Sequence, residues 1–137
     1  MKRVLTFGTF DGLHAGHKAY LSFAQAMGDL WVVVARDETV RRIKKHAPRH
    51  SEDDRYRAVA EAFPSAHVQL GDTEDYSVPL VAVNPDLIVL GYDQQLPPGI
   101  DPSYFPCPVV RAPAFEPETY KSTLIRKREE ESSQELP

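Results

Sequence analysis

The sequence of 137 residues is 42% hydrophobic and 26% charged, which is typical of one soluble globular domain. Its net charge of −4 argues against a nucleic-acid-binding protein, and its apolar runs are too short to span a membrane. The single cysteine, Cys107, excludes an intrachain disulfide, and an apolar strand pattern begins almost at once. We therefore expect no signal peptide and a cytoplasmic protein.

Five short apolar runs predict the strands of the fold. They are continuous rather than alternating in polarity, which is typical of parallel strands that are covered on both faces. The runs comprise residues 4–7, 31–35, 68–70, 87–90 and 109–110.

Helical patterns separate these runs. They cover about residues 18–27, 37–46, 52–63 and 77–83, and a last helix begins at about residue 122. Ser51 and Asp54 have the spacing of a capping box with Asp in place of Glu, and Pro64 ends that helix. The alternation predicts an α/β fold, namely a Rossmann-like, doubly wound, parallel five-stranded sheet in a single domain. A ligand is expected at the carboxyl ends of the strands, near the point where the strand order reverses.

The domain organisation follows from composition. Residues 1–128 are expected to form the folded domain. Residues 129–137 carry one apolar side chain, Leu136, among charged and polar ones. We predict that this segment is a disordered tail, because it cannot bury enough apolar surface to offset the entropy of ordering.

The segment between the first strand and the first helix, Gly8–His17, reads G-T-F-D-G-L-H-A-G-H. A glycine-rich turn before a helix directs backbone N–H groups at an anion, and the helix dipole adds to the attraction. The three glycines are four residues apart, so this is not the G-x-G-x-x-G fingerprint, and no lysine–hydroxyl pair makes it a P-loop. His14 and His17 add side-chain donors at the start of the helix. The segment predicts a nucleotide-phosphate site and displacement at phosphorus.

Further candidate residues follow other strands and open other helices. Gly91 lets the backbone turn after the fourth strand, and Asp93 can accept from a ribose hydroxyl or a base amino group; a simple strand-end turn is the alternative. Lys44 and Lys45 belong to a basic segment after the second strand, which can hold a triphosphate or an acidic co-substrate, or form a solvated helix face.

Two more candidates lie at predicted helix N-termini. Arg55, near the start of the third helix, is placed to reach phosphate. Ser122 and Thr123 present hydroxyl and N–H groups at the start of the last helix. They can bind a second anion, cap the helix, or do both.

Together these features resemble the cytidylyltransferase-like branch of the nucleotidylyltransferase superfamily. That family carries G-x-F-D-x-x-H-x-G-H, a later basic segment, an arginine on the third helix, a Gly-x-Asp after the fourth strand and an S-T motif opening the last helix. The segments A-R-D-E-T-V (35–40), L-G-Y-D-Q (90–94) and Y-K-S-T (120–123) are similar to archaeal-type FAD synthases, which are FMN adenylyltransferases. The departures are Gly12, where a bulky residue is usual, and the compressed region 71–85, which puts the identity of the acceptor in question.

The resemblance implies transfer of AMP from ATP to FMN, which forms FAD and pyrophosphate. The implied catalytic residues are His14, His17, Lys44, Lys45 and Arg55, and the implied nucleotide-binding residues are Gly8, Thr9, Phe10, His14, Gly16, His17, Gly91, Asp93, Ser122 and Thr123. Mg²⁺ or another divalent cation would bridge the triphosphate with several waters, since the sequence contains no dedicated metal cage.

ATP and FMN are thus the expected substrates, nucleic acid and membrane are not expected as partners, and a homodimer is compatible with the sequence. Two alternatives stay open. One is a cytidylyltransferase that acts on a small phosphorylated alcohol such as glycerol 3-phosphate, because Asp93 suits either base. The other is a non-catalytic nucleotide-binding protein, which pyrophosphate release with any nucleotide and acceptor would eliminate.

Overall fold

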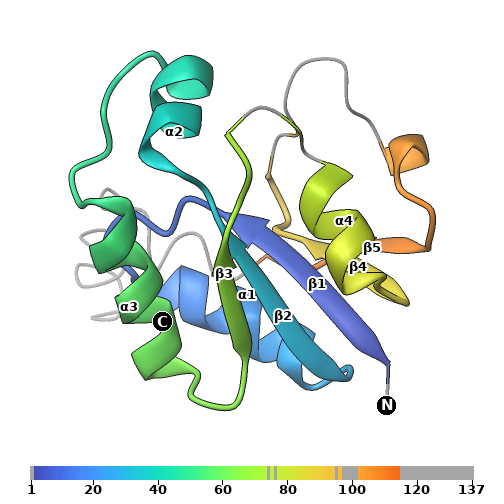
Figure 1. Ribbon diagram of the computed structural model, residues 1–137. Helices are drawn as coiled ribbons and strands as arrows, with labels where there is room; N and C mark the ends of the chain where they lie inside the picture. Colours follow the sequence, from blue (N-terminus) through green and yellow to red (C-terminus); the bar gives the residue numbers. More distant parts are fainter. Residues whose placement is uncertain (1, 74, 76, 95, 97–101, 115–137) are drawn as a thin grey trace.

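A parallel sheet of five strands forms the centre of the computed structural model, which describes residues 2–73, 75, 77–94, 96 and 102–114 (Figure 1). The strands are β1 (Arg3–Gly8), β2 (Asp29–Val34), β3 (His67–Leu70), β4 (Leu87–Leu90) and β5 (Val109–Arg111). Their order is β3-β2-β1-β4-β5, and every neighbouring pair is parallel. The order reverses between β1 and β4, which is the switch point of a Rossmann-like sheet.

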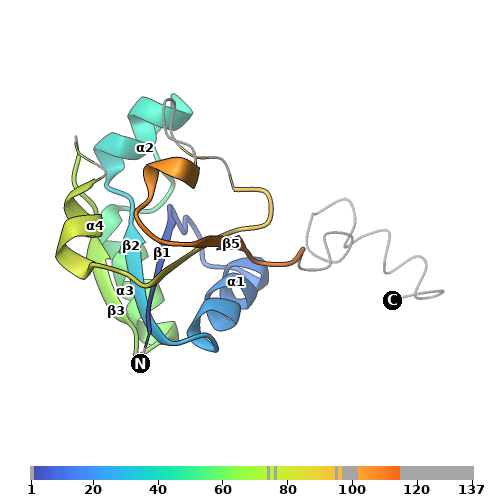
Figure 2. The same cartoon turned by 90° about the vertical axis from the view of Figure 1, so that its right-hand side faces the viewer.

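Helices cover both faces of this sheet. They are α1 (Ala15–Gln25), α2 (Asp37–Lys44), α3 (Glu52–Ala62) and α4 (Ser77–Val83), and a 3₁₀ turn, η1, spans Pro102–Tyr104. Figure 2 shows α1 and α4 on opposite sides of the strands. In Figure 1, α2 lies beyond the carboxyl ends of β1 and β2. The predicted doubly wound, single-domain α/β fold is confirmed.

Alternate side chains of the strands supply two separate cores. On one face, Val4 and Val32 pack with Leu21 of α1 and Val59 of α3. On the other face, Leu5, Val33, Ile88 and Leu90 pack with Leu80 and Val83 of α4. Burial on both faces explains why the strands are apolar without alternation.

The elements agree with the predicted ones except at some ends. The predicted helix at 77–83 and strand at 87–90 have the bounds that the structure shows. α1 begins three residues before the predicted position, because the side chain of His14 caps it. α2 ends at Lys44, since Lys45 takes a left-handed conformation with φ 67°. The predicted last helix and tail lie outside the described residues.

Candidate functional site

The loops that follow β1 and β4 meet at the carboxyl edge of the sheet, as the sequence predicts. β1 and β4 are neighbours, and the loop after β4 is bonded to the end of β1. The side-chain amide of Gln94 donates from Nε2 to the carbonyl of Phe7 at 3.0 Å. The Gly8–His17 segment and the Gly91–Gln94 loop therefore form opposite sides of one candidate site.

Two stacked imidazoles open α1. The rings of His14 and His17 have centroids 3.7 Å apart and are inclined by only 15°. Nδ1 of His14 accepts from the N–H groups of Gly16 (3.1 Å) and His17 (3.3 Å), and Nδ1 of His17 accepts from the N–H of His14 (3.3 Å). Each ring thus caps the helix through Nδ1. An Nδ1 atom that accepts cannot carry the proton, so the hydrogen bonds assign the proton of each neutral ring to Nε2.

The charge state of His17 follows from its surroundings. Burial lowers the pKa of His17 to about 4, and the nearby charges of His14 and Lys44 lower it further. His17 is therefore neutral at pH 7. Among the residues that the structure describes, none accepts a hydrogen bond from either Nε2–H, so both donors are available to the oxygens of a ligand.

The capping changes the expected role of the backbone. The N–H groups of Gly16 and His17 donate to His14 Nδ1, so they are not the free anion-binding donors that the glycine-rich turn predicts. In this arrangement the imidazole donors, rather than these backbone groups, face outward from the start of the helix. The expectation for Gly16 as a nucleotide-binding residue stays a prediction.

Gly8 and Phe10 shape the start of the loop. Phe10 has φ 54°, and its ring is only 2% exposed. The ring lies edge-on to His17, with centroids 5.4 Å apart. A Cβ at Gly8 would lie 2.6 Å from Cζ of Phe10, which is closer than carbon atoms approach. Gly8 is required here because the Phe10 ring packs against its backbone and supports His17.

Asp11 fastens the loop that joins α2 to α3. Its two carboxylate oxygens accept from the N–H groups of Arg49 (2.7 Å) and His50 (2.9 Å). Slight desolvation raises the pKa of Asp11, but these hydrogen bonds and the nearby positive charges outweigh it, so that the net pKa is below its usual value. The fourth residue of the motif thus has an anchoring role that its spacing alone does not reveal.

Arg55 does not lie where a phosphate would contact it. Its side chain is fully buried. The guanidinium donates to the carbonyls of His50 (2.9 Å), Thr9 (2.9 Å) and Ala35 (2.7 Å), and to the carboxylate of Asp37 (2.6 Å). In place of the expected phosphate contact, the structure shows a clamp that joins the segments after β1 and β2 to the starts of α2 and α3.

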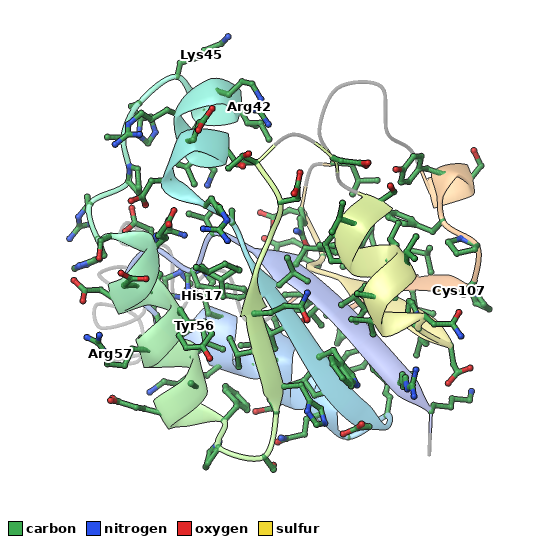
Figure 3. The ribbon with its side chains drawn as sticks, viewed as in Figure 1. His17, Arg42, Lys45, Tyr56, Arg57 and Cys107 are labelled. Atoms are coloured by element: carbon green, nitrogen blue, oxygen red, sulfur yellow. The ribbon has the colours of Figure 1, made fainter. Side chains whose placement is uncertain are left out.

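The basic residues of α2 separate into different positions. The charge of Lys44 reaches His17 and contributes to its lowered pKa. Lys45 lies at the end of α2 and is directed away from the sheet (Figure 3). Arg42 donates to the carbonyl of Thr73 at 2.5 Å and ties α2 to the segment after β3. Of the two candidate lysines, Lys44 is therefore the one on the side of the histidine pair.

The loop after β4 is held by the side chains of Gln94 and of Arg111 on β5. The N–H of Gly91 donates to Oε1 of Gln94 at 2.8 Å. Arg111 donates to the carbonyls of Gly91 (2.8 Å) and Gln94 (2.9 Å). Tyr92 and Asp93 between them are exposed, so Asp93 is accessible at the edge where a nucleotide is expected. The segment is also a turn, since the N–H of Gln94 donates to the carbonyl of Gly91 at 3.1 Å, and the nucleotide-binding role of Gly91 and Asp93 stays a prediction.

Some expectations lie beyond what the structure describes. Ser122 and Thr123 fall outside the described residues. Within the described part of the chain, no three His, Cys, Asp or Glu residues are grouped so as to hold a metal ion. No helix in that part is long and apolar enough to cross a membrane.

Four residues of the site were not singled out from the sequence: Asp11, Tyr20, Gln94 and Arg111. Asp11 and Gln94 lie within segments that carry the family resemblance, so the sequence could have indicated that they belong to the site. It could not have indicated which groups they bond to. Tyr20 and Arg111 had no signal, because their roles depend on contacts between segments far apart in the sequence.

Comparison with known proteins decides the family. The family model described as "Cytidylyltransferase-like" matches residues 5–128. The chain belongs to the cytidylyltransferase-like family. A solved structure titled as the lipopolysaccharide core biosynthesis protein from Thermoplasma volcanium GSS1 is similar, with a TM-score of 0.76 and 34% identity over 85% of this chain and 99% of that one.

Several proteins named FAD synthase are also similar to the chain. The protein from Methanopyrus kandleri is 48% identical over 99 residues, which are 69% of this chain and 65% of that protein. The protein from Methanosphaerula palustris is 44% identical over 103 residues, 73% of this chain and 65% of that protein. The alignments thus span just under two thirds of these two relatives. The protein from Haloferax volcanii is 42% identical over 122 residues, 82% of each chain.

Proposed function

We propose that the protein is an FMN adenylyltransferase, which transfers AMP from ATP to FMN and releases pyrophosphate. The observation that carries the proposal is the 42% identity to a FAD synthase over 82% of both chains. The geometry supports it, because two stacked imidazoles with available Nε2–H donors, of which His17 is neutral at pH 7, stand at the carboxyl edge next to the switch point.

In the proposed reaction, a phosphate oxygen of FMN attacks the α-phosphorus of ATP. A new P–O bond forms, the bond from the α-phosphorus to the bridging oxygen breaks, and pyrophosphate leaves with that oxygen. The nucleophile is already anionic, so no strong general base is needed. Positioning and charge stabilisation then carry most of the rate enhancement.

The residues divide into contacts and supports. His14 and His17 donate from Nε2 to the phosphoryl oxygens, where negative charge develops. Lys44 attracts the phosphates from the end of α2, and Asp93 accepts from the nucleoside. Arg55 and Asp11 act as positioning residues, because their hydrogen bonds hold the surrounding loops.

A divalent cation such as Mg²⁺ fits this site as a companion of the nucleotide. Both oxygens of Asp11 and one of Asp37 are occupied by protein donors, which leaves Asp93 as an exposed carboxylate at this edge. The triphosphate and water would therefore supply the ligands, because Asp93 is assigned to the nucleoside. The cation would neutralise charge on the phosphates.

The decisive experiment measures pyrophosphate release from ATP and from CTP, with FMN and with glycerol 3-phosphate as acceptors. FAD formation from ATP and FMN is expected. Turnover of CTP with glycerol 3-phosphate instead would establish the alternative cytidylyltransferase activity. Nucleotide binding without turnover of any pair would make the protein a non-catalytic nucleotide binder.

Two substitutions separate catalysis from helix capping. Asn in place of His14 keeps an acceptor for the first-turn N–H groups but removes Nε2–H, and Gln in place of His17 keeps the capping box. We expect His14→Asn and His17→Gln each to lower kcat by about a hundredfold, with the fold retained in circular dichroism. Wild-type turnover in either variant would show that this histidine only caps the helix and takes no part in catalysis.

A further inference from the structure

The backbone ladder between β1 and β4 stops one step before the site. The register pairs Val4 with Leu87, Leu5 with Ile88 and Thr6 with Val89. One further step would pair Phe7 with Leu90. In a parallel ladder, that step would join the N–H of Phe7 to the carbonyl of Val89, and the N–H of Gly91 to the carbonyl of Phe7.

The hydroxyl of Tyr20 takes the place of the first of these bonds. It donates to the carbonyl of Val89 at 2.6 Å and accepts from the N–H of Phe7 at 3.4 Å. Burial raises the pKa of Tyr20 more than the hydrogen bond from Phe7 lowers it, so the hydroxyl keeps its proton for Val89. A side chain from α1 is thus inserted between the two strands.

The carboxamide of Gln94 takes the place of the second bond. Its Oε1 accepts from the N–H of Gly91 at 2.8 Å, and its Nε2 donates to the carbonyl of Phe7 at 3.0 Å. The donor and the acceptor that the ladder would have joined directly are each satisfied by one end of this amide.

Both strands continue on their other sides. β1 stays paired with β2 as far as Gly8, whose carbonyl accepts from Ala35 at 2.9 Å. β4 stays paired with β5 at Leu90, whose carbonyl accepts from Ala112 at 2.7 Å. The separation is therefore confined to the switch point, where open α/β sheets bind their ligands.

We propose that Tyr20 and Gln94 are positioning residues that fix the spacing between β1 and β4 at the switch point, and through it the distance between the histidine segment and the Gly91–Asp93 loop. Gly8 follows Phe7 directly, and Gly91 opens the loop that carries Asp93. A nucleotide that contacts both loops binds tightly only at one spacing. The inference rests on the proposed function, because it takes a nucleotide as the ligand between these loops.

The test compares Tyr20→Phe and Gln94→Glu with matched controls on the same protein. Tyr20→Phe keeps the ring and removes the hydrogen bonds of the hydroxyl with Val89 and with the backbone of Phe7. Gln94→Glu keeps the shape and the acceptor but, as a carboxylate, cannot donate to Phe7. The controls are Tyr56→Phe, at an exposed tyrosine on α3, and Gln25→Glu, at a partly exposed glutamine on α1 whose Nε2 donates to Ser65.

We expect each test variant to raise KM for ATP about tenfold, while kcat falls less than threefold and the controls match the wild type. The dissociation constant of ATP, measured by calorimetry without acceptor, is expected to rise by the same factor. Amide hydrogen exchange is expected to accelerate at Phe7 in Tyr20→Phe. In Gln94→Glu it is expected to accelerate at the residues flanking Gly91, where the new carboxylate repels the Phe7 carbonyl.

The outcomes distinguish this inference from the proposed function. A lower melting temperature with unchanged KM and unchanged ATP affinity would overturn the inference, since the two side chains would then be structural only. If the wild type binds ATP but does not adenylylate FMN, the proposed function fails, and weaker ATP binding by both variants would still support the spacing role. If the wild type does not bind ATP at all, both fail.

Discussion

Replacement of Arg55 by methionine tests the clamp at the carboxyl edge most directly. The substitution keeps an apolar stem of similar length and removes the guanidinium, which is fully buried and serves four acceptors. Each of the three carbonyls left without this donor costs about 1 kcal/mol. The Asp37 carboxylate is 26% exposed. Breaking its ion pair with Arg55 should therefore cost about 2 kcal/mol, which is less than breaking a fully buried ion pair.

These losses sum to about 5 kcal/mol, and removal of a buried charge returns part of them. We expect Arg55→Met to lower the free energy of unfolding by about 4 kcal/mol. That is a large part of the total for a typical domain, which is roughly 5–15 kcal/mol. The assay is urea denaturation followed by circular dichroism. In a thermal scan the midpoint is expected to fall by about 15 °C.

Arg57→Met is the matched control, because Arg57 lies on the same helix and points outward in Figure 3. Its ion pair with Asp54 is 64% and 61% exposed at the two side chains, so its loss should change stability by less than about 0.5 kcal/mol. A loss below about 1.5 kcal/mol in Arg55→Met would refute the clamp. A phosphate-contacting arginine would instead leave stability intact and weaken ATP binding.

Three other perturbations test the site. The folded-state pKa of His17 is about 4, below the value near 6.5 for an unfolded histidine, so stability should be full above pH 6.5 and fall toward pH 4. Urea unfolding should show a free energy of unfolding lower at pH 5 than at pH 7 by on the order of 1 kcal/mol, and this difference should shrink in His17→Gln. The same pH dependence in the wild type and the variant would contradict the low pKa. Gly8→Ala should cost about 1–3 kcal/mol because its Cβ meets the Phe10 ring, whereas Gly91→Ala, with its nearest contact at 3.5 Å, should cost less than 1 kcal/mol, roughly. Asp11→Ala should accelerate amide exchange at residues 49–50, and unchanged exchange there would show that the loop needs no anchor.

Much of the fold could be predicted because the sequence signals are strong and local. Four of the five strands stand out as apolar runs between polar segments, and parallel strands buried on both faces need such runs. The start of α1 could not be predicted from capping rules, which favour Ser, Thr, Asp and Asn. His14 caps the helix through Nδ1, and a histidine ring reaches these N–H groups only when it is oriented, here by stacking on His17.

The site was predictable in its location but less so in the roles of its residues. The histidine pair and the Gly91 loop lie where the motif and the strand order place them. Arg55 was expected at a phosphate. Its guanidinium is instead buried beside three carbonyls and a carboxylate, which come from parts of the chain too far apart for a local sequence pattern to reveal. The sequence alone marks Gln94 only as the last residue of the segment L-G-Y-D-Q. Its role becomes visible only when β1 and β4 are aligned side by side.

The central position of β1 has a consequence for biosynthesis. β1 precedes the other strands in the chain, yet one of its neighbours, β4, begins only after 78 further residues, and the link between Arg3 and Asp86 spans 83 positions. Until β4 emerges from the ribosome, β1 is an unprotected sheet edge rich in apolar side chains, which is the kind of surface on which chains aggregate. Ribosome stalling or truncation before Leu87 thus exposes the central strand of the finished sheet, and chaperone demand should peak there.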